Sequence, residues 1–213
     1  MMPISACLRL AAVFSLALST LLLTACTTLH APTSQTGMDT AARPYSDTID
    51  ISGRFSAQFE QNGRPQSWSG SFNWVQTPQA TFITLLSPLD QTVATISVTH
   101  DGATLTQADK TPRTAADVDA LVQETLGWPL PISNLRNWMQ ARARDRDGHQ
   151  ILATPRLINT IDTDDGWRLQ YLSWQDASEP GMQNVPKRID MERDTVQAGR
   201  VQMRLVISSW QPR

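Results

Sequence analysis

Residues 51–74 carry the clearest fold signal in the chain and read ISGRFSAQFEQNGRPQSWSGSFNW. In its first half, apolar or small residues alternate with polar ones, which is the period of a half-buried β-strand. The residues predicted to face inward are Ile51, Gly53, Phe55, Ala57 and Phe59. The second half alternates in the same way, with Trp68, Gly70, Phe72 and Trp74 on one face. Between the halves, Asn62-Gly63 is a strong hairpin signal, because both central residues of a type I′ turn need a positive φ. The stretch therefore predicts two antiparallel strands with a shared apolar face.

The strand pattern continues after this hairpin. Pro78 marks a break, and the residues beyond it predict a third strand over 80–86 and a fourth over 91–99. His100-Asp101-Gly102 predicts a turn into a short fifth strand over 103–106. The first half of the chain is therefore predicted to be an antiparallel meander.

Two helices are predicted in the middle of the chain. The first has apolar or small residues at helical spacing, namely Val118, Leu121, Val122 and Thr125. Residues 114–117 resemble a capping box begun by Thr114, and Gly127 supplies a stop. Ser133 is predicted to cap a second helix, which carries Leu135, Trp138 and Met139 on one side.

The second half returns to strands. Residues 142–149 alternate in charge and predict a solvated loop, with phosphate binding by its arginines as the alternative. Four more strands are predicted over 156–161, 166–175, 187–193 and 200–210. This order of elements predicts a mainly β fold with α: one curved antiparallel sheet with the two helices packed against its concave side.

The N-terminus has the pattern of an export signal. Arg9 is the only charged residue before Asp39, and it precedes the apolar run 10–23, which is short for a bilayer span. The run ends in Leu23-Thr24-Ala25-Cys26, which resembles the lipobox of bacterial lipoproteins. An ordinary secretory signal with an incidental cysteine is the alternative. The lipobox predicts that residues 1–25 are removed and that Cys26 carries the lipid.

The segment after the cysteine predicts a tether. Residues 26–46 have no apolar period and are rich in Thr, Ser, Ala and Pro, which is typical of a flexible linker. The folded domain is then predicted to span 47–213. Without Cys7 and with Cys26 lipidated, that domain has no disulfide to form.

Composition excludes several classes of function. The chain has 18 Lys plus Arg and 20 Asp plus Glu, a balance that argues against an electrostatic nucleic-acid binder or a polybasic membrane-surface protein. Trp supplies 7 of the aromatic residues, against 5 Phe and 2 Tyr. Because Trp combines a large apolar area with one polar group, this share suits interfaces and roomy pockets. Acyl or other apolar partners remain open.

The sequence carries no recognisable catalytic or metal-binding motif. His30 lies in the predicted tether, while His100 and His149 lie in predicted turns, without the spacing of a zinc site. The acidic residues of 162–165 precede Gly166 and favour a hairpin turn over the alternative, a calcium loop. No nucleophile elbow or nucleotide-binding glycine pattern is present. We therefore predict no enzyme, no metal and no cofactor.

A set of short motifs, taken in order, resembles the LolB family of outer-membrane lipoprotein receptors. Besides the lipobox, the motifs are GRFS at 53–56, GSFNW at 70–74, LSPL at 86–89, LGWPLP at 126–131, LRNWM at 135–139 and Trp210. Each motif is short, so it is their order along nearly the whole predicted domain that makes the resemblance specific.

The resemblance implies both a fold and a function. The fold would be an unclosed antiparallel β-barrel whose helices form a lid over an apolar cavity. The protein would be lipid-anchored in the cell outer membrane, facing the periplasm. It would accept lipoproteins from the periplasmic carrier LolA and insert them into the inner leaflet. The implied partners are that carrier, the acyl chains of cargo lipoproteins and outer-membrane phospholipid, with the protein itself a monomer that binds no nucleic acid.

The resemblance also implies site residues. Pro88 and Leu89 match a loop in which an exposed leucine touches or enters the membrane; the alternative is a leucine folded inward. Asp90 and Ala141 stand where glycine is common in the family, and a carboxylate at position 90 costs free energy at a membrane. The residues predicted to line the acyl-chain cavity are Phe55, Phe72, Trp74, Leu121, Leu126, Leu135 and Trp138.

Two other functions stay open from the residues alone. One is a lipoprotein that scaffolds or assembles the envelope without acyl-chain transfer, which predicts a filled interior. The other is a periplasmic hydrolase, which needs converging carboxylates or a Ser-His pair in a cleft.

Overall fold

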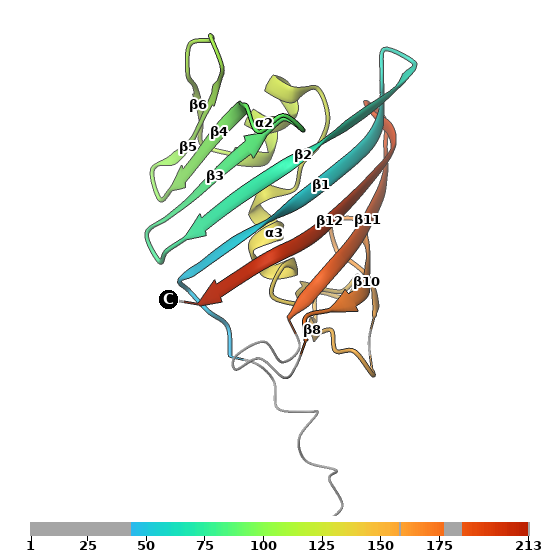
Figure 1. Ribbon diagram of the computed structural model, residues 1–213. Coiled ribbons are helices and arrows are strands. Elements are labelled where there is room, and N and C mark those ends of the chain that lie inside the picture. Colours follow the sequence, from blue (N-terminus) through green and yellow to red (C-terminus); the bar gives the residue numbers. More distant parts are fainter. Residues whose placement is uncertain (1–43, 158, 177–184, 213) are drawn as a thin grey trace, which may run out of the picture. The chain divides into compact units, whose positions relative to one another are not determined.

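The computed structural model describes residues 44–157, 159–176 and 185–212 (Figure 1). The predicted signal segment and lipidation site, Cys26, lie outside the described residues, as does the predicted tether up to residue 43. Among the residues that are described, none belongs to a helix with the length and apolar character needed to cross a membrane.

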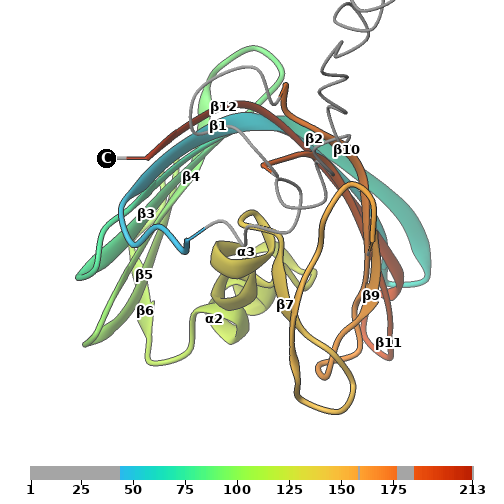
Figure 2. The same cartoon turned by 90° about the horizontal axis from the view of Figure 1, so that it is seen from below.

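A ten-stranded antiparallel sheet forms the wall of the domain, in the order β6-β5-β4-β3-β2-β1-β12-β11-β10-β9. The N-terminal strands are β1 (Ile49–Gln61), β2 (Arg64–Gln76), β3 (Ala80–Leu86), β4 (Thr92–Thr99), β5 (Gly102–Gln107) and β6 (Arg113–Ala115). The C-terminal strands are β9 (Thr160–Asp162), β10 (Arg168–Trp174), β11 (Pro186–Thr195) and β12 (Gly199–Pro212). Because β1 pairs with β12, the two halves of the chain join in the middle of the sheet, and β6 and β9 end it. The sheet curves strongly but does not close (Figure 2).

The predicted hairpin is confirmed in detail. Asn62 and Gly63 connect β1 to β2 with φ values of 54° and 70°. Across the pair, Ile51 lies opposite Trp74, and Phe55 lies opposite Gly70. The inward residues of β1 are buried, as their alternation predicts.

Two helices, α2 (Val118–Leu126) and α3 (Ile132–Trp138), lie inside the curve of the sheet (Figure 2). Both helices and the stop at Gly127, with φ 85°, are confirmed. The two predicted caps are wrong. Asp117 rather than Thr114 caps α2, by accepting a 2.7 Å hydrogen bond from the Ala120 amide.

The cap of α3 differs because another partner takes the predicted capping side chain. Pro131 precedes the helix and makes no side-chain cap. The Ser133 hydroxyl instead donates to Asp119 of α2. Ser133, which was predicted to cap α3, therefore links α3 to α2.

The predicted loop at 142–149 is partly strand. β7 (Arg142–Arg144) and β8 (Gln150–Leu152) form a separate hairpin, in which Ala143 is buried. The predicted strand over 156–161 is too early, because the amide of Leu157 bonds back to the hydroxyl of Thr154 and holds the chain in a turn before β9. The acidic segment after β9 is the predicted hairpin turn, closed by a 2.7 Å bond from the Thr163 amide to the Trp167 carbonyl.

Candidate functional site

The space between α3 and the sheet is almost filled. An apolar cavity of about 30 Å³ remains there. It is lined by Phe55, Phe72, Trp74, Ile83, Leu85, Leu130, Ile132, Leu135, Met139, Met203 and Leu205. This volume is about that of one water molecule, well below the roughly 300 Å³ at which ligand pockets begin. The side chains of the lid therefore occupy the place that the sequence assigns to a ligand.

Four of the predicted cavity residues meet at this cavity: Phe55, Phe72 and Trp74 from the sheet, and Leu135 from α3. Ile83 and Leu85 of β3 and Met203 and Leu205 of β12 also line the cavity and were not predicted, although strand alternation is a signal that could have found them. Three further lining residues were not predicted: Leu130 and Met139, which lie within the motifs at 126–131 and 135–139, and Ile132, which lies between these motifs.

The other three predicted residues lie elsewhere. Leu121 is buried on α2, and Leu126, at the end of that helix, is only half-buried. Trp138 packs edge to face against Trp167, with ring centroids 6.1 Å apart. In the part of the chain that is described, none of the three lines the apolar cavity.

Trp128, in the linker between the two helices, holds the lid to the β1–β2 hairpin. Its ring stacks on Phe59 at 5.3 Å and meets Trp68 edge to face at 6.2 Å. Its Nε1 is buried and finds no hydrogen-bond partner among the described residues. An unpaired buried N–H costs about 1–3 kcal/mol, so the closed lid carries a local energetic penalty.

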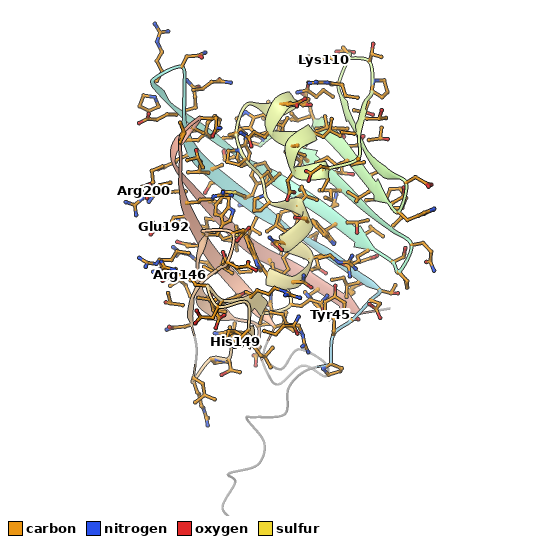
Figure 3. All side chains as sticks on the ribbon, turned by 180° about the vertical axis from the view of Figure 1, so that it is seen from behind. Tyr45, Lys110, Arg146, His149, Glu192 and Arg200 are labelled. Atoms are coloured by element: carbon orange, nitrogen blue, oxygen red, sulfur yellow. The ribbon has the colours of Figure 1, made fainter. Side chains whose placement is uncertain are left out.

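Three contacts fix the C-terminal end of α3. Tyr171 of β10 donates from its hydroxyl to the Trp138 carbonyl at 3.0 Å. Gln140 and Ser46 exchange two hydrogen bonds: the Ser46 amide donates to Oε1 at 2.8 Å, and Nε2 donates to the Ser46 carbonyl at 3.0 Å. Arg136 donates to the hydroxyl of Tyr45 at 3.1 Å. Figure 3 shows Tyr45 at the opposite end of the domain from Lys110.

The N-terminal end of α3 is held mainly through α2. The Ser133 amide and hydroxyl both donate to the carboxylate of Asp119. Burial raises the pKa of Asp119, and the hydrogen bonds from Ser133 offset only part of that rise. Asn134 adds a 2.9 Å bond to Asp165. Among the described residues, this end of the helix thus has one side-chain hydrogen bond outside the two helices and their linker, against three groups of hydrogen bonds at the other end.

The loop between β3 and β4 presents the predicted membrane residues to solvent. Leu89 is 82% exposed, and Pro88 is exposed as well, so the leucine does not fold inward. Ser87 shapes the loop, because its hydroxyl oxygen accepts 3.3 Å bonds from the amides of Leu89 and Gln91. Asp90 has φ 56°, the left-handed region that glycine favours and aspartate tolerates. Asp90 therefore adopts a backbone conformation that glycine would favour at this position.

Ala141 also lies in the left-handed region, at φ 62°. Its side chain is fully buried. A left-handed alanine costs about 1–2 kcal/mol. The surrounding contacts, including the 2.8 Å bond from the Ala153 amide to the Ala141 carbonyl, hold it there.

The two histidines in the described part of the chain, His100 and His149, lie in exposed turns. His100 pairs with Asp101, and its side chain is 87% exposed. His149 lies in the β7–β8 turn, where its potential metal-binding nitrogen is within 4.8 Å of carboxylate oxygens of Asp145 and Asp147. Hydrogen bonds within the turn account for this cluster, because the amides of Asp147 and His149 donate to Asp145 at 3.0 and 2.8 Å. The simplest Ser-His hydrolase is therefore not supported.

Comparison with known proteins places the chain in a family. The sequence profile described as "Outer membrane lipoprotein LolB" matches residues 47–210. A protein named outer-membrane lipoprotein LolB from Cupriavidus taiwanensis is 36% identical over 197 residues, covering 90% of this chain and 93% of its own length. The protein of the same name from Cupriavidus necator is 37% identical over 199 residues, covering 90% and 92%. A solved LolA superfamily structure from Nitrosomonas europaea is 9% identical, with a TM-score of 0.47, and covers 81% of this chain and 89% of its own. The profile match and the two relatives show that this chain belongs to the LolB family of outer-membrane lipoproteins.

Proposed function

We propose that this protein accepts lipoproteins from the periplasmic carrier LolA and inserts them into the inner leaflet of the outer membrane. The observation that carries the proposal is the apolar contact between α3 and the concave face of the sheet, in a chain of the LolB family. The cavity at that contact is lined by aliphatic, aromatic and thioether side chains, so an acyl chain can replace the lid against the same sheet residues.

The lid must move for a chain to enter. A cavity of about 30 Å³ holds no acyl chain, and leaving the chain in water costs about 0.8 kcal/mol for each methylene. We infer that α3 swings about its C-terminal end, where Tyr171, Ser46 and Tyr45 hold it. Its first turn, which includes Ile132, leaves the sheet together with Leu130. The unpaired Nε1 of Trp128 favours this opening.

We infer that the free energy of the acyl chain falls at each step of transfer. The sequence carries no nucleotide-binding motif, so no bond cleavage drives the cargo. Because long chains exposed to water are strongly disfavoured, carrier and receptor must shield the chain between them during the exchange. The chain then passes from the carrier to this sheet and on to the bilayer, which buries it most completely.

The anchor and the membrane loop complete the proposal. Lipidation at Cys26 tethers the domain, predicted to span 47–213, through residues 26–46. Because acyl chains attach a protein stably only when more than one is present, a multiply acylated cysteine suits this role. Leu89 touches or enters the bilayer and helps release cargo there. In this role the protein works as a monomer and needs no catalysis, metal or cofactor.

The scaffolding alternative has one observation in its favour, namely the nearly filled interior. It differs from the transfer function in a simple way: a scaffold never takes cargo from the carrier. A chain that begins at Thr27, and so lacks both the signal segment and the lipidation site, is mixed with LolA carrying an acylated lipoprotein, and the cargo is followed by size-exclusion chromatography. We expect cargo to move to this chain. Cargo that stays on LolA would overturn the receptor assignment and favour the scaffold.

A further inference from the structure

The sheet has an opening beside β2. β3 ends at Leu86, so its pairing with β2 stops at Ser71, whereas β2 continues back to Arg64. Residues 64–70 pair with β1 on one side and extend beyond the end of β3 on the other. Figure 1 shows β2 rising past the end of β3 toward its hairpin.

A groove of about 340 Å³ lies at this opening. Its apolar lining is Phe55, Trp68, Leu85, Leu86, Pro88 and Val93. We call it the wall groove. Its volume is within the range of about 300–1,000 Å³ that ligand pockets occupy, and it is more than ten times the cavity under α3.

The wall groove is lined from both faces of the sheet. Phe55 and Leu85 belong to the buried, concave face, and both also line the cavity under α3. Leu86 follows Leu85 directly and so points to the opposite face, as Ser67 and Ser69 do on either side of Trp68. A groove lined from both faces crosses the wall, and it is separated from the interior by side chains that the two spaces share.

Glycine makes the crossing possible at the point where β2 and β3 diverge. A Cβ atom at position 70 would lie 1.9 Å from the Leu86 carbonyl oxygen and 3.3 Å from the Phe55 ring. Only a residue without a side chain allows the end of β3 to approach β2 this closely. Phe55 then contacts Trp68 edge to face, at 6.4 Å, across the inner end of the groove.

We propose that the wall groove binds an acyl chain of the cargo as the chain leaves the interior for the bilayer; this rests on the transfer function proposed above. The outer end of the groove is formed by Pro88, next to the exposed Leu89. A chain that follows this path stays against apolar side chains from the sheet to the membrane loop. The hydroxyls of Ser67, Ser69 and Ser87 at the groove can hydrogen-bond the ester or amide oxygens at the head of the chain.

Blocking the groove tests this path. In the full-length lipidated protein, Ser69→Cys and, as a matched control, Asn73→Cys are each modified with the same bulky maleimide. Both residues are exposed on the same strand, but only Ser69 lines the groove. Acquisition of cargo from LolA and insertion of cargo into liposomes are measured separately. For modified Ser69→Cys we expect normal acquisition and at least a tenfold loss of insertion, with both steps normal in the control.

Three outcomes would overturn the proposal. Insertion at the wild-type rate with the groove blocked means that chains leave by another route, while the transfer function stands. Loss of acquisition in modified Ser69→Cys alone makes the groove an entrance. If the unmodified protein accepts no cargo, the proposed transfer function is wrong, and the role of the wall groove is wrong as well.

A photo-crosslink identifies the occupant. p-Benzoylphenylalanine replaces Val93 in the groove or, as control, Phe82, which is exposed on the neighbouring strand and outside the groove. During transfer of a lipoprotein with radiolabelled palmitate, we expect labelled adducts at position 93 and none at 82. Crosslinks from position 93 to polypeptide alone would assign the free edge of β2 to a protein strand and contradict an acyl occupant.

Discussion

The hydroxyl of Tyr171 donates a hydrogen bond of 3.0 Å to the carbonyl oxygen of Trp138, which joins the centre of β10 to the last turn of α3. Tyr171 is buried, and burial raises its pKa, so the hydroxyl stays protonated and remains a donor. The Trp138 carbonyl also accepts from the Ala141 amide at 2.9 Å. One end of the lid is therefore fixed to the sheet.

Tyr171→Phe should lower the free energy of unfolding by about 1 kcal/mol, the net value of one hydrogen bond. The loss stays this small because the carbonyl keeps its bond to Ala141. Urea denaturation followed by tryptophan fluorescence measures it. Gln170→Ala, at an exposed position of the same strand, is the control and should change stability by less than about 0.5 kcal/mol. Equal effects of the two substitutions would remove the anchoring role of Tyr171.

Ala141→Gly should be nearly neutral, although it removes a buried methyl group. Losing the methyl costs about 0.8 kcal/mol, and the freedom glycine adds to the unfolded chain costs about 0.4–1 kcal/mol. Relief of the left-handed backbone returns about 1–2 kcal/mol. Ala143 is also buried but has no positive φ, so replacing it with glycine relieves no backbone strain. Ala143→Gly should therefore lower the free energy of unfolding by about 1.5 kcal/mol, through the lost methyl group and the added freedom of the unfolded chain. Urea titrations of the two variants measure the free energy of unfolding. An equal decrease in Ala141→Gly and Ala143→Gly would contradict strain at Ala141.

Leu89→Glu should separate acceptance of cargo from its insertion. Leu89 is 82% exposed, so the substitution leaves folding and cargo uptake unchanged, while a carboxylate disfavours contact with the bilayer. We expect insertion into liposomes to fall at least tenfold. Leu157→Glu is the matched control, because Leu157 is 71% exposed in a different loop. Loss of insertion in both variants, or loss of uptake in Leu89→Glu, would refute a specific role for this loop.

The stability of the sheet should fall in acid through Asp190. Burial raises the pKa of this carboxyl, but hydrogen bonds from Arg188 and Arg204 outweigh that effect, and the pKa is lowered overall. A lowered folded-state pKa gives stability that is present above the unfolded pKa of about 4 and is lost as pH falls through the folded pKa.

Asp190→Asn should therefore cost about 1 kcal/mol at pH 7. The difference from wild type should shrink toward zero below pH 3, as the wild-type carboxyl becomes protonated. Urea titrations of both proteins across this range measure it. A difference that stays constant with pH would show that the ion pairs contribute nothing to the acid response.

The sequence predicts the hairpin and the meander because their signals are local. The alternation along β1 and the turn signal of Asn62-Gly63 depend only on residues within one turn and the two strands it joins. The following strands then pair with their neighbours in chain order. The β7–β8 hairpin was missed because a single buried residue, Ala143, stands among charged ones.

The cavity could be predicted only in part, because its members meet through long-range pairing. Met203 and Leu205 come beside Phe55 because β12 pairs with β1, a register that no local pattern encodes. Which side of each helix faces the sheet also depends on contacts with residues far away in the sequence. Tyr171 fixes the Trp138 end of α3, and Asp119 captures the predicted cap Ser133, so helical spacing alone could not tell which lid residues face the cavity.

Transfer of an acyl chain through this domain requires that the first turn of α3 leaves the sheet when the chain enters. Spin labels at Ser133→Cys, on that turn, and Asn73→Cys, on the exposed face of β2, report the distance between lid and sheet by double electron–electron resonance. The lipidated protein is measured empty, after loading by LolA, and after release of the cargo to liposomes. We expect the distance distribution to shift to longer values on loading and to return after release. An unchanged distribution in a protein that has retained its cargo would contradict movement of α3 away from the sheet.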